Sequence, residues 1–185
     1  MSRIVLKPMP QPAEGCCIGT YEGRPLVMLD RSYLADGVLL SQEAIGEDLV
    51  EAVDAAATRV LGHEWVSSLA RLMQINRRPT STDRIARFGL PEHALLFLAQ
   101  ASAHSHPRAL GHALLCVVEL QEAHTTASHT SGRPAAVDIA ERNSATAATY
   151  RRALHVLDAV LAEREAFRRR KDPEWDYSGK PLTDR

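Results

Sequence analysis

The stretch LGHEWVSSLARLMQINRRPTSTDRIARFG, residues 61–89, is the most informative part of this sequence for predicting the fold. Its first half predicts a short amphipathic helix over 64–73, because apolar residues recur there at intervals of three or four. These residues are Trp65, Leu69, Leu72 and Met73. The run Gln74-Ile75-Asn76-Arg77-Arg78-Pro79 then breaks the helix, since proline cannot continue it.

The second half of the stretch predicts another short helix. Thr80-Ser81-Thr82-Asp83 matches a capping box, in which the Thr80 hydroxyl accepts a hydrogen bond from the Asp83 N–H. We expect this helix to bury Ile85 and Phe88 and to end at Gly89. The stretch as a whole therefore predicts two short helices joined by a turn.

The helical pattern continues on both sides of this pair. Upstream, Ser41 can cap a helix over 42–61 that Gly62 ends. Downstream, Pro91 and Pro107 suit the first positions of two further helices. A loop rich in Thr, Ser, His and Gly over 124–134 leads to a long helix over 137–170.

The N-terminal segment is less helical in character. Three prolines in 1–15 indicate an extended arm, and Glu22-Gly23 between two β-prone runs predicts a hairpin, with a second turn at Asp36-Gly37. The expected fold is mainly α: a helical bundle with an embedded helix-turn-helix and a small N-terminal β-hairpin. The expected segments are an arm at 1–15, a hairpin segment at 16–40, a helical domain at 41–124 with the helix-turn-helix at 64–90, a long helix at 134–171 and a tail at 172–185.

Charge is unevenly distributed along a chain whose net charge is -1. Residues 61–110 carry six Lys and Arg against three Asp and Glu, whereas residues 1–60 carry five against nine. Local positive charge matters more than the total for binding nucleic acid. The absence of an 18-residue apolar run or a secretory signal, together with three unpatterned cysteines, favours a cytoplasmic protein without a membrane span.

Residues 61–78 also resemble a known family. Gly62, Trp65 and Leu69-Ala70-Arg71 follow a G-x-x-W-x-x-x-L-A-R pattern, and Asn76-Arg77-Arg78 follows N-x-R. This stretch is similar to the opening of helix-turn-helix domains of the phage-repressor (Cro/repressor-like) type, over about thirty residues (61–90). The sequence departs from that pattern at Gln74, where the family usually has glycine, and at Pro79, which delays the second helix.

The resemblance implies a DNA-binding transcriptional regulator. It implies that Arg77 and Arg78 contact phosphates and that Ser81, Thr82 and Arg84 reach base edges, with Arg87 on the same basic face. The competing interpretation is a pair of packed amphipathic helices with a solvated arginine face. The alternative function is a helical adaptor or inhibitor that binds another protein and has no nucleic-acid role.

Other sequence patterns also bear on function. Five histidines, at positions 104, 106, 112, 124 and 129, lack the spacing of zinc ligands and are better explained as solvated side chains. No phosphate-binding or catalytic motif occurs, so we expect neither an enzyme nor a cofactor. The basic run at 163–171 complements a helix C-terminus or supplies a second phosphate contact.

The long C-terminal helix offers a further alternative. Apolar residues follow steps of three and four over about two heptads. They are Ala147, Tyr150, Leu154, Leu157 and Leu161. This line is either a core stripe or the seam of a homodimer, and a homodimer through this helix is the possible partner arrangement.

Overall fold

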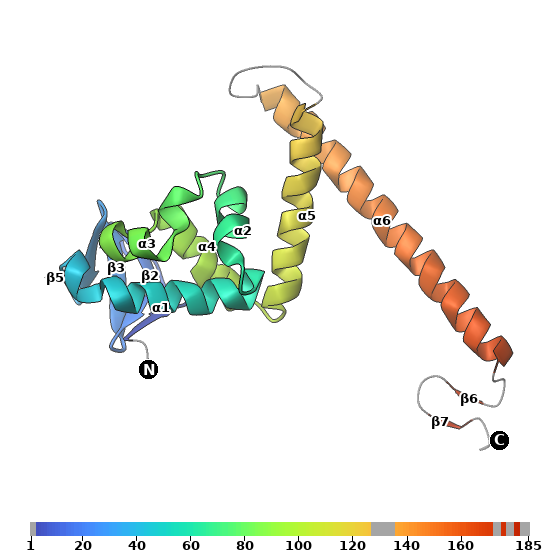
Figure 1. Cartoon of the computed structure of the whole chain (residues 1–185), viewed down its shortest axis with the longest axis horizontal. Helices are drawn as coiled ribbons and strands as arrows, with labels where there is room; N and C mark the ends of the chain where they lie inside the picture. The colour runs from blue at the N-terminus through green and yellow to red at the C-terminus, as the bar shows by residue number, and fades with distance from the viewer. Residues whose placement is uncertain (1–2, 127–135, 172–174, 177–179, 182–185) are drawn as a thin grey trace. The chain divides into compact units, whose positions relative to one another are not determined.

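The computed structural model describes residues 3–126, 136–171, 175–176 and 180–181, with side chains described for 3–122 and 139–169 (Figure 1). The chain divides into two compact units, Met1–Glu119 and Leu120–Arg185. None of the described helices is long and apolar enough to cross a membrane.

The first unit begins with a five-stranded antiparallel sheet in which each strand pairs with the next along the chain. Its strands are β1 Ile4–Leu6, β2 Cys16–Tyr21, β3 Arg24–Leu29, β4 Ser32–Ala35 and β5 Val38–Leu40. The predicted fold class, a mainly α bundle with a small hairpin, is therefore wrong. The sheet is a major layer of the molecule, and β1 lies within the segment predicted as an extended arm.

Three tight turns explain why so short a segment holds so many strands. Each leaves two residues between paired strands, and both residues have positive φ: Glu22-Gly23, Asp30-Arg31 and Asp36-Gly37. This is the type I′ geometry that matches strand twist. The turns predicted at Glu22-Gly23 and Asp36-Gly37 are confirmed. The middle turn contains no glycine or asparagine, so the sequence offered no signal for it.

The first strand depends on a glycine in its neighbour. Ile4 and Leu6 are buried and Val5 is exposed, which is the alternation of a strand with one covered face. Gly19 in β2 has a φ of 153°, and a Cβ there would lie 2.0 Å from the Val5 carbonyl oxygen. Only glycine allows β1 to approach this closely, so Gly19 lets the arm join the sheet.

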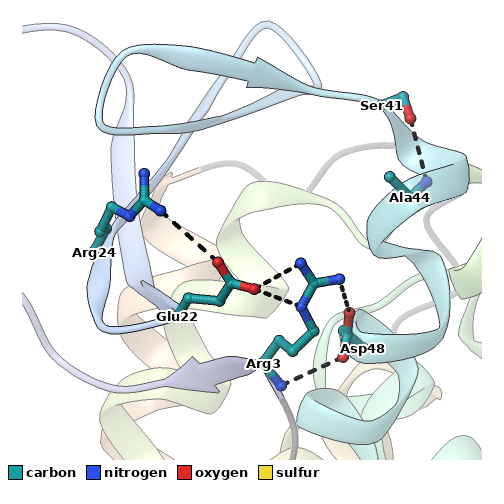
Figure 2. Close-up of polar contacts among 6 residues, drawn as sticks. All are labelled: Arg3, Glu22, Arg24, Ser41, Ala44 and Asp48. Carbon is teal, nitrogen blue, oxygen red and sulfur yellow. Dashed lines mark hydrogen bonds and ion pairs between the residues drawn. The ribbon is translucent and has the colours of Figure 1, made fainter.

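A polar cluster also ties β1 to the rest of the unit (Figure 2). The Arg3 Nε donates to Glu22 at 2.8 Å, and Arg3 Nη1 lies 3.6 Å from Asp48. The Arg3 guanidinium also lies 4.8 Å from the centroid of the Tyr21 ring. One arginine therefore joins the first strand to the β2–β3 turn and to the following helix.

Six helical segments follow the sheet, and the last of them continues past Glu119 into the second unit. They are α1 Gln42–Leu61, α2 Trp65–Leu72, the 3₁₀ helix η1 Arg78–Thr80, α3 Thr82–Phe88, α4 Glu92–Ser102 and α5 Pro107–Thr126. The predicted start and end of α1 are confirmed: Ser41 accepts from the Ala44 N–H at 3.2 Å, and Gly62 follows with a φ of 89°.

The core lies between the sheet and the helices. α1 packs against β1, α2, α3 and α4, and α4 packs against β1 and β2. The largest fully buried side chains come from both layers: Ile4, Ile18, Leu26, Tyr33, Ile45, Leu49, Trp65, Leu69, Ile85, Leu90, Leu95 and Leu98. The apolar face of α1 therefore serves as the central packing surface of this unit.

The second unit contains α6 Ala136–Lys171 and a short pairing of β6 Trp175–Asp176 with β7 Lys180–Pro181. The sequence predicts a loop over 124–134, but α5 continues to Thr126. The rest of the predicted loop lies outside the described residues. Gln121 at the end of α5 donates to Asn143 of α6 at 3.2 Å. From residue 147 to residue 169 every α6 side chain is exposed within this chain.

Candidate nucleic-acid interface

The segment between α2 and α3 is held by a buried threonine. Thr80 is fully buried in η1, and its hydroxyl lies 3.1 Å from the Val66 carbonyl oxygen and 2.7 Å from that of Arg77. The predicted capping box is wrong, because Ser81 is the N-cap and makes no side-chain capping bond. The single hydroxyl proton is within reach of both carbonyl oxygens, one of them in α2, and this buried contact helps hold η1 against α2.

Close contact with α1 positions α3. A Cβ on Gly46 of α1 would lie 2.3 Å from the Ala86 carbonyl oxygen of α3. Gln42 donates its side-chain amide to the carbonyls of Ala86 at 2.8 Å and Ile85 at 3.2 Å. The last carbonyls of a short helix are thus paired by a side chain of its neighbour.

Phe88, predicted to be buried, is 68% exposed. The helix ends at this residue, and Gly89, with a φ of 69°, turns the chain so that Leu90 enters the core instead. The guanidinium of Arg84 lies 5.3 Å from the centroid of the Phe88 ring. An exposed aromatic face with an arginine over it is therefore presented at the end of α3.

The structure gathers four of the six predicted contact residues around one hollow, here called the arginine hollow. It is lined by Arg78, Ser81, Asp83, Arg84, Arg87 and Phe88. Arg77 and Thr82 are exposed but do not line it. The basic surface is thus concave and is formed by η1 and α3 together.

The charges of the arginine hollow are largely uncompensated. Within the described part of the chain, no ion pair joins Arg78, Arg84 or Arg87 to a carboxylate, and Asp83 is the one acid that lines the hollow. Arg71 of α2 differs, because its Nη1 lies 3.8 Å from a Glu119 oxygen. Clustered arginines without acidic partners favour an anionic ligand.

A larger cleft of about 580 Å³ adjoins the hollow, and it is here called the adjoining cleft. Its lining includes Arg78, Pro79, Arg84, Phe88, Gly89, Leu90, Pro91 and Glu92, and on the sheet side Met28, Asp30 and Arg31. The sequence did not point to Arg31, because the β3–β4 turn carries it to α3 from far along the chain. The turn at Asp30-Arg31, where both residues have positive φ, was not predicted, and without it the position of Arg31 could not be predicted.

Two buried groups near this region are uncharged at neutral pH. Burial raises the pKa of Tyr33 to about 12, and the Tyr33 hydroxyl packs where a Cβ of Gly89 would stand, 2.4 Å from it. Burial, with a further contribution from the Glu92 carboxylate, raises the pKa of the Cys16 thiol to about 11. Neither group is therefore an activated nucleophile near pH 7.

Comparisons of the chain with known protein families, with curated proteins and with solved structures found no match. The described residues contain no group of three or more His, Cys, Asp or Glu side chains placed to hold a metal ion. In the histidine-rich segment, the side chains of His124 and His129 lie outside the described residues. The arginine hollow and the adjoining cleft are thus the candidate functional sites among the described residues.

Proposed function

We propose that the protein is a DNA-binding transcriptional regulator that contacts double-stranded DNA through the arginine hollow. The observation that carries the proposal is the grouping of Arg78, Arg84 and Arg87 around one hollow without an ion-pair partner in the described part of the chain. Arginine forks suit phosphate oxygens, and phosphate contacts supply most of the affinity for DNA. A cytoplasmic location is part of this proposal.

The size of α3 is compatible with such a role. An α-helix with its side chains is about 10–12 Å in diameter, which fits a major groove about 12 Å wide, and the seven residues of α3 span about 10 Å along it. Ser81 and Thr82 stand at the start of α3, where short hydroxyl side chains approach base edges. Arg77, which precedes η1, supplies a further phosphate contact from outside the hollow.

The double substitution Arg84→Gln with Arg87→Gln is expected to weaken duplex binding about tenfold or more at low salt and to reduce the slope of log K against log salt by about two. Both substitutions remove a positive charge from the proposed DNA-binding surface, so fewer counterions are released from the duplex on binding. Fluorescence polarisation with a generic duplex at several salt concentrations measures both quantities. Arg59→Gln, at an exposed arginine of α1, is the control and should bind as the wild type does. Absence of salt-sensitive binding at micromolar wild-type protein would rule out the proposal.

Self-association through α6 forms the second part of the proposal. Tyr150, Leu154, Leu157 and Leu161 share one face at heptad spacing and are between 39% and 52% exposed. A stripe of large apolar side chains on a helix is normally covered. The heptad spacing suits a second copy of the same helix.

Charge favours an antiparallel arrangement of the two copies. With Leu154 beside the partner's Leu157, Arg151 flanks the seam opposite the partner's Asp158, and the symmetry of the pair produces this contact twice. A parallel pair brings Ala153 rather than an arginine toward the partner's Asp158. Complementary charges therefore select the antiparallel register.

Substituting Leu154→Gln together with Leu157→Gln is expected to convert a dimer into a monomer, because two apolar layers of the seam are lost while helix propensity is kept. Light scattering over a concentration series measures the change, and Arg152→Gln, away from the seam, is the control. Arg151→Asp should weaken the dimer, and adding Asp158→Arg should restore it. A monomeric wild type, or failure of the charge exchange to restore association, contradicts the antiparallel dimer.

The alternative function, a helical adaptor or inhibitor, draws on the same exposed line of α6. A helix of another protein could cover Leu154 and Leu157 as a second copy would. Two measurements discriminate the functions: a monomeric chain that binds no duplex favours the adaptor, whereas a dimer with salt-sensitive duplex binding favours the regulator.

A further inference from the structure

The adjoining cleft is more than a phosphate surface, because much of its lining is apolar. Met28 and Leu90, which are buried, line it together with Pro79 and Pro91. Its volume of about 580 Å³ falls within the range of roughly 300–1,000 Å³ found for small-ligand sites. Contacts to DNA phosphates alone do not require an apolar cleft of this size.

Cations around the cleft come from three separate segments. Arg31 belongs to the β3–β4 turn, Arg78 to η1 and Arg84 to α3. In the described part of the chain, no ion pair joins any of the three to a carboxylate. They suit a phosphate held between the sheet side and the helix side.

The same cleft has features that suit a planar base. Phe88 lines it and is 68% exposed, with the Arg84 guanidinium 5.3 Å from the ring centroid. Exposed aromatic faces beside arginines are the usual platforms for nucleobases. Asp30 and Glu92 also line the cleft, and carboxylates accept hydrogen bonds from the amino groups of bases.

We propose that the adjoining cleft binds one unpaired nucleotide, with its phosphate at Arg31, Arg78 and Arg84 and its base stacked on Phe88. The inference rests on the proposed function, because Arg78 and Arg84 serve both sites. A paired base cannot enter, since both of its faces are already stacked within the duplex. The nucleotide is therefore either free or part of a single-stranded segment.

Calorimetric titration tests this with four probes: inorganic phosphate, deoxyadenosine monophosphate, a single-stranded 12-mer and the matching duplex. We expect the mononucleotide or the single strand to bind more tightly than phosphate. Phe88→Ala should weaken that binding about tenfold or more, as removal of one stacking ring does. Arg31→Gln should weaken it as well while keeping duplex affinity within about twofold, because Arg31 lines the cleft but not the arginine hollow. Arg59→Gln is again the control.

The four probes also identify the source of the nucleotide. Binding of the mononucleotide identifies the ligand as a free nucleotide. Binding of the 12-mer alone identifies it as a nucleotide within a single strand. The inference is overturned if neither binds more tightly than phosphate, or if Phe88→Ala and Arg31→Gln bind both as the wild type does. Duplex binding without nucleotide binding refutes the nucleotide site in the cleft and supports the DNA-binding regulator. Nucleotide binding without duplex binding refutes the regulator and supports the nucleotide site.

Discussion

Trp65→Ala is expected to lower the free energy of unfolding by about 3–5 kcal/mol, the usual cost of removing a large aromatic side chain from a core. Trp65 is 2% exposed at the start of α2, and its indole N–H donates to Asp54 of α1 at 2.7 Å. The substitution leaves a cavity between the two helices and removes their polar connection. Urea unfolding followed by far-ultraviolet circular dichroism measures the loss.

Trp65→Phe separates the two contributions of this residue. It keeps most of the apolar burial but removes the hydrogen bond to Asp54, so a smaller loss of about 1–2 kcal/mol is expected. Asp54→Asn, in contrast, keeps an acceptor for the indole and should be nearly neutral. An unfolding midpoint of Trp65→Ala equal to that of the wild type would show that α2 does not depend on this side chain.

Gly46→Val is expected to affect stability and DNA binding together. The added Cβ meets the Ala86 carbonyl at 2.3 Å, and a backbone atom cannot rotate away, so α3 must move from α1. We expect a loss of about 3 kcal/mol, at the upper end of overpacking costs, because valine recovers little helix propensity over glycine. Moving α3 also displaces Arg84 and Arg87, so duplex affinity should fall.

The control for this prediction is Ala55→Val, at an exposed position of α1. It measures the helix propensity of valine without a contact to α3, and a loss below about 1 kcal/mol is expected. Circular dichroism and polarisation on the same samples connect stability to binding. If Gly46→Val retained wild-type stability and duplex affinity, α3 would not owe its position to the glycine.

Local patterns predicted the helices well because their signals lie within a few residues. The spacing of Ile45, Leu49 and Val53, with Ser41 before and Gly62 after, was sufficient to place α1. The sheet was underestimated for the opposite reason. The pairing of β1 depends on Gly19 in another strand, and the β3–β4 turn uses Asp30 and Arg31 instead of the usual turn residues.

The candidate site was likewise predictable only in part from local sequence. Arginine clustering at 77–87 was visible in the sequence, and the repressor-like resemblance stays a prediction. The sequence could not tell that Phe88 is exposed while Leu90 is buried, because a short helix ends between them at Gly89. It also could not tell that Thr80 is buried inside the fold, where its hydroxyl lies within hydrogen-bond distance of the carbonyl oxygens of Arg77 and of Val66 in α2.

The sequence alone thus predicted the helix boundaries, two of the hairpin turns and the basic character of 77–87. Capping, turn geometry and charge depend on residues close together in the chain, so local sequence is enough to predict them. The extent of the sheet, the concave shape of the arginine hollow and the presence of Arg31 beside α3 were decided by tertiary structure. They arise where Gly19, Gly46 and Gly89 permit close packing of segments far apart in the chain. Each of these contacts depends on two segments that are far apart in the chain, so the local sequence around one segment is not enough to predict it.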